Sequence, residues 1–304
     1  MTKKRIFLFA AMAFCLFMLV CAVAFPRETA QSVKNSLSLC VRSVVPSLFV
    51  FSVLASLFAR LGLFSRAGRA ALFAGISPAV FSCALCGILC GFPTSAVVAA
   101  EMYRMGEADA DEMRAALPFC SNAGMAFVCG AVGEGMLGNV RAGYLLFALQ
   151  SLLSIVFILL FMRKRGGGFP LPRVRESFPR ALTASVSAAG TAMINVCAFM
   201  VFFGAAADMI CLVFPALPPF LRALICSFAE ISRGCSEFAS ADISPLLRGI
   251  CVAWALGFSG ISVACQIVDR AGGIGVRLLP FLAKKAVFGL LMAAIYGIFV
   301  LFVI

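Results

Sequence analysis

The chain has 304 residues, of which 63% are hydrophobic and 12% charged, and its mean hydropathy is +1.07. A soluble domain is closer to half apolar and a quarter charged, so this composition excludes the soluble classes and predicts an all-α polytopic membrane protein. The net charge of +12 comes from Lys and Arg residues placed mostly between apolar runs, where they set membrane orientation. It therefore does not indicate nucleic-acid binding.

The first apolar run covers residues 6–25 and follows Lys3-Lys4-Arg5. A cleaved signal peptide is the alternative interpretation, but its apolar region would be longer than the usual 7–15 residues. We therefore expect an uncleaved first span with its N-terminus in the cytoplasm, then a short polar connection outside that holds Arg27, Glu28, Lys34 and Arg42, and a second span over 44–59.

The next apolar segment, residues 71–100, is interrupted by Pro78 and by Gly91 and Pro93. These interruptions favour a helical hairpin that enters and leaves the membrane on one side, although a single tilted crossing is the alternative. A charged, solvated loop that contains a short helix is expected over residues 101–114. A helix over 116–137 then crosses outward, and a helix over 142–162 returns.

Residues 163–180 form the most basic stretch, which the positive-inside rule places in the cytoplasm. Binding of nucleic acid or anionic lipid is a weaker alternative for this stretch. The second half predicts a span over 182–214, an interrupted segment over 220–242 and a crossing over 246–268. The segment from Arg270 to Lys285 marks the inside again, and the last span covers 286–304.

The two halves share one plan, in which a span, an interrupted segment and a helix with a polar break follow one another. Thr94 and Gly124 are 30 residues apart, and so are Glu230 and Gly260. Because the halves start on opposite sides, we predict inverted repeats with about seven spans and two re-entrant hairpins, as in many secondary transporters. The predicted regions are an N-terminal helix and loop (1–36), a first repeat with its following helix (37–162), a basic loop (163–180), a second repeat (181–270) and a C-terminal helix (271–304).

Four stretches carry a resemblance to a known family. They are residues 90–95 (CGFPTS), the helical residues 101–103 (EMY), residues 119–124 (FCSNAG) and residues 133–138 (GEGMLG). With them the chain resembles sporulation integral membrane proteins of the YlbJ type, which carry nucleoside-recognition (Gate) domains and are similar in plan to concentrative nucleoside transporters. The resemblance runs from about residue 37 onward. It implies a transporter-like protein in the membranes around the forespore, with dipicolinate as the leading cargo.

The broken helices supply the candidate binding residues, because half-helix N-termini present free N–H groups to anionic ligands. The first half contributes Gly91, Pro93, Thr94, Ser95, Ser121, Asn122 and Gly124, and the second half contributes Ser232, Arg233 and Ser259. Ser259 is a softer candidate, as are Asn195 and Gln266. The alternative is that these small and amide residues serve close helix packing.

Glu230, Arg233 and Glu237 are spaced so that a helix would place them along one face. Charges at membrane depth are expensive, so this set is a functional hypothesis, with Arg233 for a substrate carboxylate and Glu230 or Glu237 for proton coupling. A self-neutralising structural pair, or a segment at the outer surface, is the alternative.

The sequence lacks the usual features of an enzyme or a metal protein. It contains no His, no nucleophile elbow and no phosphate loop, and the helical spacing of Cys83, Cys86 and Cys90 is better explained by packing. We therefore expect no enzymatic activity, no cofactor and no metal.

The function predicted is alternating-access transport of a small anionic solute in the cytoplasmic membrane, with the membranes around the forespore as the alternative location. A nucleoside-type solute, or a non-transporting scaffold for spore assembly, remains the alternative. The expected partners are the solute and the lipid bilayer, and self-association into a homo-oligomer is left open.

Overall fold

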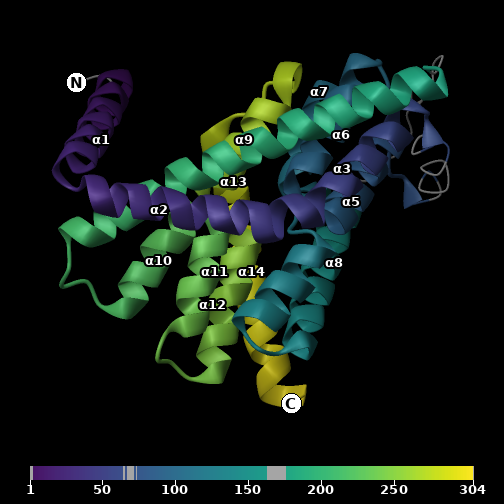
Figure 1. Ribbon diagram of the computed structural model, residues 1–304. Helices are drawn as coiled ribbons and strands as arrows, with labels where there is room; N and C mark the ends of the chain where they lie inside the picture. Colours follow the sequence, from purple (N-terminus) through teal and green to yellow (C-terminus); the bar gives the residue numbers. More distant parts are fainter. Residues whose placement is uncertain (1–2, 64–65, 67–71, 73, 163–175, 304) are drawn as a thin grey trace.

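The computed structural model describes residues 3–63, 66, 72, 74–162 and 176–303, and all regular elements in these ranges are helices. They are α1 (Lys3–Ala24), α2 (Pro26–Leu39), the π-helix η1 (Cys40–Val44), α3 (Val45–Arg60), α5 (Pro78–Cys90), α6 (Phe92–Arg104), α7 (Ala110–Cys120), the π-helix η3 (Ala126–Met136), α8 (Val140–Phe161), α9 (Phe178–Val213), α10 (Pro219–Ala229), α11 (Ile231–Ser240), α12 (Pro245–Phe258), α13 (Gly260–Arg270), the 3-10 helix η4 (Gly272–Ile274) and α14 (Leu278–Val303). The protein is thus an all-α polytopic membrane protein (Figure 1).

Four described helical segments are long and apolar enough to cross a membrane: 140–161, 178–213, 245–270 and 278–302. A fifth crossing is counted if α1 and α2, which meet at an angle of 105°, form one bent span. The described residues also form shorter apolar helices of 10–17 residues: Leu48–Arg60, Pro78–Cys90, Ala126–Met136 and Pro219–Ala229. Most of the basic stretch 163–180 lies outside the described residues.

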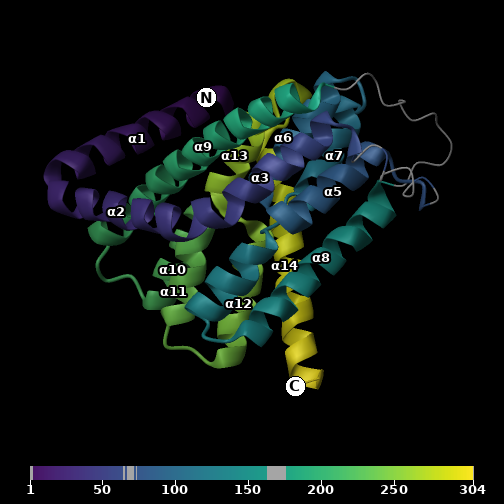
Figure 2. The ribbon, with the colours of Figure 1, turned by 45° about the vertical axis from the view of Figure 1, so that its right-hand side comes forward.

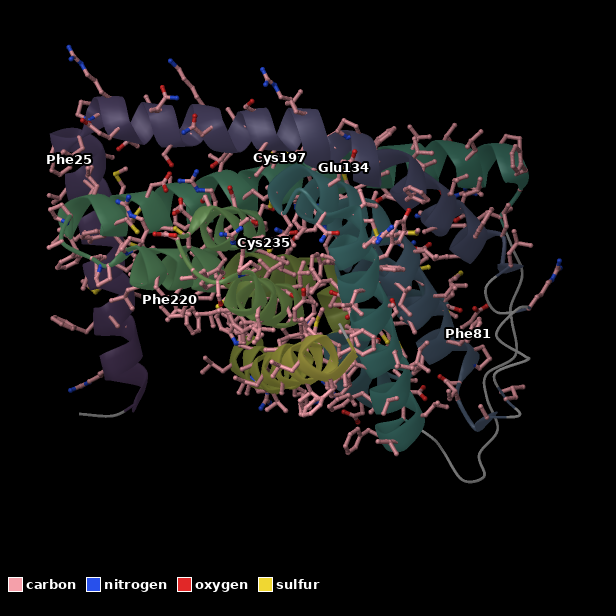
Figure 3. All side chains as sticks on the ribbon, turned by 90° about the horizontal axis from the view of Figure 1, so that it is seen from below. Phe25, Phe81, Glu134, Cys197, Phe220 and Cys235 are labelled. Atoms are coloured by element: carbon pink, nitrogen blue, oxygen red, sulfur yellow. The ribbon has the colours of Figure 1, made fainter. Side chains whose placement is uncertain are left out.

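The polar connection expected after the first span is wrong, because Pro26 begins a helix there. Pro occupies the first turn of α2, where its missing N–H is not needed, and the chain turns sharply at Phe25. Figure 3 shows this bend at one edge of the molecule, with Phe81 of α5 toward the opposite edge. Helix α2 packs along α9 with Ser32 and Ser36 buried, so polar residues of α2 face inward as well as outward.

The interrupted segment of the first half is two helices joined at Gly91. Gly91 has φ +98°, a conformation that favours glycine, and Pro93 lies in the first turn of α6. Helices α5 and α6 have 13 residues each, about 20 Å, which is shorter than the ~30 Å hydrocarbon core. Because they also pack side by side, they form a hairpin.

The stretch 101–114 contains the helix expected in it, but the prediction that Glu101 lies in solvent is wrong. Helix α6 continues to Arg104 and α7 begins at Ala110, capped by the Asp109 side chain. Glu101 is buried and accepts hydrogen bonds from Arg104 at 2.5 and 2.6 Å, and it lies 3.4 Å from Arg60. Ion pairing therefore holds this acid within the protein rather than in solvent.

The single helix expected over 116–137 is also wrong, because the polar motif interrupts it. Helix α7 ends at Cys120, residues 121–124 are non-helical, and η3 follows from Ala126. Pro118 removes one backbone donor within α7. Side chains then bind carbonyl groups of the break: Asn122 donates to Phe119 O and Gln150 of α8 donates to Ala123 O. The motif thus breaks the membrane segment in its middle rather than at its start.

The second half repeats this arrangement. Helices α10 and α11 pack side by side and are joined at Glu230, whose backbone is extended. Helices α12 and α13 form one crossing segment, interrupted at Ser259, which has φ 72°. Each half therefore holds one hairpin and one broken segment, with breaks at Gly91 and 121–124 in the first and at Glu230 and 259–260 in the second.

The two halves exchange contacts at the centre of the protein. Helix α6 of the first hairpin packs on α13, and α11 of the second hairpin packs on η3. Around this centre lie α3, α8, α9 and α14, while α1 extends along the edge, as Figures 1 and 2 show. The largest hydrophobic cluster spans both halves. The breaks consequently meet inside one core.

Candidate functional site

The helix breaks surround a cavity of about 40 Å³, which we call the central cavity. One ordered water needs ~10–15 Å³ measured this way, so the space holds a few waters and is smaller than an aromatic dicarboxylate. Its walls come from three of the four breaks and from η1, α3 and α9. The lining residues are Val44, Leu48, Gly91, Phe92, Pro93, Gly124, Phe127, Val196, Met200, Glu230, Ile231, Ser232, Val263 and Gln266.

Close backbone approach holds the breaks around this cavity. A Cβ on Gly91 would lie 3.2 Å from the Gly124 nitrogen, and a Cβ on Gly260 would lie 3.2 Å from the Ser227 oxygen and 3.4 Å from the Cα of Glu230. The two breaks of each half therefore touch each other. Larger side chains at Gly91 and Gly124 would fill the space where the breaks meet.

The first turns of α6 and α11 both line the central cavity. Phe92 and Pro93 contribute from α6, and Ile231 and Ser232 contribute from α11. The N-terminal turn of a helix has N–H groups without intrahelical acceptors and carries the positive end of the helix dipole. The cavity therefore lies at the positive dipole ends of two helices, one from each half.

Glu230 carries the charged side chain among the described residues of this lining. It is 2% exposed, and its carboxylate accepts a hydrogen bond from the Arg233 backbone nitrogen at 2.9 Å. Glu230 is thus the N-cap of α11 and does not lie on the helical face expected for it. The cap stabilises the carboxylate at the positive end of the helix.

Arg233 and Glu237 point to a different space, which separates them from Glu230. The Arg233 guanidinium pairs with Asp208 of α9, and Asp208 also accepts a hydrogen bond from Ser32 of α2. Arg233, Asp208 and Glu237 line an outer cavity of about 310 Å³ together with Glu28 and Arg222. Sequence reasoning did not place Asp208 in a site, because its partner is 25 residues away and not on its own helix.

The remaining first-half candidates hold the breaks together by hydrogen bonds. Thr94 Oγ1 is 3.2 Å from Ser52 Oγ, and Ser95 Oγ is 3.0 Å from Ser121 Oγ. All four hydroxyl groups are buried. Ser95 and Ser121 therefore join the hairpin to the first broken segment directly.

Asn122 is fully buried within its break rather than in the cavity wall. Its Nδ2 donates to Phe119 O and to Ser154 Oγ, both at 3.0 Å, while its Oδ1 has no partner. Gln150 Nε2 of α8 donates to the adjacent Ala123 carbonyl at 2.9 Å. Asn122 and Gln150 thus replace the helical hydrogen bonds that the break removes, and one acceptor stays open.

Lys285 is a further functional candidate. The prediction that it belongs to the inside loop is wrong. It lies in α14, is 0% exposed, and its Nζ donates to the Ser121 carbonyl at 2.9 Å. The ammonium also sits 4.8 Å from the centre of the Phe288 ring, and no described carboxylate pairs with it. A lysine without a counter-ion at this depth is expensive, and its only signal in the sequence was its position at the start of an apolar run.

Three softer candidates lie in the second half. Gln266 lines the central cavity and donates to Ser262 at 3.3 Å, and Ser259 donates to the Leu256 carbonyl at 3.1 Å within its break. Asn195 of α9 donates to Asp269 at 3.1 Å, away from the cavity lining. Gln266 is therefore the one of these three that faces the cavity.

Comparison with known proteins gives one informative relative. No family model matches the chain, and no solved structure matches it. The chain is similar to the sporulation integral membrane protein YlbJ of Bacillus subtilis (strain 168), with 22% identity over 327 aligned positions that cover 92% of this chain and 80% of that protein. The extent of this similarity confirms the resemblance to the YlbJ-type family of sporulation integral membrane proteins.

Proposed function

We propose that this integral membrane protein moves a small solute across a membrane during spore formation by alternating access. One observation carries the proposal: both hairpins and the first broken segment place their interruptions, at Gly91, Glu230 and Gly124, in the wall of a cavity inside the core. Irregular backbone at membrane depth is tolerated where it is buried or lines a wet space, and transporters use such breaks for their binding sites.

The proposed solute is a small anion, with dipicolinate as the leading cargo. The first turns of α6 and α11 favour an anion, whereas the Glu230 carboxylate repels one. Protonation of Glu230 removes this repulsion, so an anion would enter together with a proton. The central cavity, at about 40 Å³, must widen to admit an aromatic dicarboxylate. In this proposal the observed conformation is therefore an occluded state.

A nucleoside-type solute is the second candidate. The described lining of the central cavity contains one acid, two polar side chains and no base, and its remaining walls are mainly apolar. An uncharged, partly aromatic solute with hydroxyl donors suits such a wall and pairs with an ionised carboxylate. A scaffold without transport is the third candidate.

Uptake into vesicles tests the proposal. The purified protein is placed in liposomes, and the entry of labelled dipicolinate or labelled nucleosides is measured with and without an acidic exterior. We expect dipicolinate uptake that the acidic exterior accelerates, and loss of that acceleration in Glu230→Gln. The matched control Glu134→Gln, an exposed acid of η3, should behave as the unmodified protein.

The outcomes separate the candidates. Nucleoside uptake that is independent of the pH gradient would replace the anionic solute by a nucleoside-type one. Absence of uptake of every probe by protein that is inserted and folded would favour the scaffold and reject transport.

A further inference from the structure

A third cavity lies between α7 and α14, outside the site described above. Its volume is about 250 Å³, well above the ~10–15 Å³ that one ordered water needs. Basic residues dominate its charge: Arg114, Arg277 and Lys284 line it together with the single acid Asp111. Three positive charges and one negative charge leave a net positive wall.

The partners of these side chains show which charges are available. Arg114 pairs with Asp111 and donates to the Ile274 carbonyl at 3.1 Å, so its charge is largely compensated. Arg277 and Lys284 form no ion pair with a described residue. Two cations therefore line the cavity without an ion-pair partner among the described residues, Arg277 exposed and Lys284 half-buried.

The position of the cavity identifies the kind of ligand. Helix α14 is one of the candidate spans, and the cavity lies at its N-terminal end, beside Arg277, Pro280 and Phe281. The start of a spanning helix lies at the depth of the lipid headgroups, and its dipole adds positive potential there. Apolar and basic residues side by side suit an anion attached to an apolar body.

We propose that this cavity binds a phosphate group, held by Arg277 and Lys284 at the membrane surface. The group is carried either by an anionic lipid headgroup or by a free phosphate ion. Lys285, the neighbour of Lys284 in α14, donates a hydrogen bond to the Ser121 carbonyl in the first broken segment. The proposed phosphate ligand Lys284 is therefore adjacent in sequence to the residue that contacts this break.

Ligand-dependent thermal stability of the full-length protein in detergent tests the proposal. The probes are phosphatidylglycerol, phosphatidylcholine as its uncharged counterpart, and inorganic phosphate against chloride at equal ionic strength. We expect saturable stabilisation by phosphatidylglycerol or by phosphate. The double variant Arg277→Gln/Lys284→Gln should weaken it about 25-fold, at about fivefold for each removed charge.

Two further variants make the result decisive. Arg27→Gln/Lys34→Gln removes two exposed charges from α2 and should leave the binding unchanged. Arg277→Lys/Lys284→Arg keeps both charges and should retain it, which separates charge loss from misfolding. Stabilisation by phosphatidylglycerol alone assigns a headgroup, and stabilisation by phosphate also assigns a free anion. Equal weakening in the α2 variant, or no saturable stabilisation by either probe, overturns the proposal.

Discussion

Replacement of Lys285 by Met should separate stability from function. The change removes a charged hydrogen bond to Ser121 worth ~1.5–3 kcal/mol and a cation–π contact worth up to ~2 kcal/mol. It also removes an ammonium that is 0% exposed and has no carboxylate partner in the described part of the chain, a burial that costs several kcal/mol. These effects nearly cancel, so the free energy of unfolding should be unchanged or higher in Lys285→Met.

The assay is thermal unfolding in detergent beside solute uptake in liposomes. Lys285→Ala leaves an unfilled space and should be ~2–5 kcal/mol less stable than Lys285→Met. Uptake by Lys285→Met should fall about tenfold, ~1.4 kcal/mol, because the break loses its contact with α14. Lys34→Met, an exposed change in α2, is the control. Equal destabilisation by Met and Ala would refute the reasoning, since the ammonium would then be a net structural tie.

Three other changes test the packing of the breaks. Gly87→Ala should prevent stable folding, because the new Cβ would lie 1.6 Å from the Cys120 oxygen. In the control Gly130→Ala the new Cβ meets no atom within 4 Å, so comparable thermal stability of the two variants would contradict the geometry. Asn122→Ala should lose ~1–3 kcal/mol with its two buried hydrogen bonds, measured by thermal unfolding against Asn35→Ala at an exposed site. Arg233→Gln should lower the free energy of unfolding by ~1–3 kcal/mol, because Asp208 loses its ion-pair partner. The double variant Arg233→Gln/Asp208→Asn should recover part of this loss, and strict additivity of the two changes would argue against the ion pair.

The positions of the helix breaks were largely predictable from local sequence. Gly91 and Pro93 cannot continue a helix easily, and the polar motif at 121–124 competes for backbone hydrogen bonds, so both breaks follow from residue chemistry. The extent of the second break was misjudged, because whether a helix survives such a motif depends on partners such as Gln150 and Lys285 from distant helices.

The partners of the charged residues were not predictable in this way. Helical spacing suggested that Glu230 and Arg233 act together, but the break falls on Glu230 and turns its side chain to another cavity. Arg233 instead meets Asp208, and Lys285 enters the core although an adjacent lysine stays near the surface. Such choices depend on how distant helices pack, and one sequence holds no local signal for them.

The length of α9 links this protein to the thickness of its bilayer. Its 36 residues extend for about 54 Å, while the hydrocarbon layer is ~30 Å thick, so the helix must tilt or extend beyond the hydrocarbon layer. Val196 and Met200 in its middle line the central cavity, and Asp208 near its end holds Arg233. A change in lipid chain length should therefore alter the tilt of α9. The central cavity and the outer cavity would then change shape together.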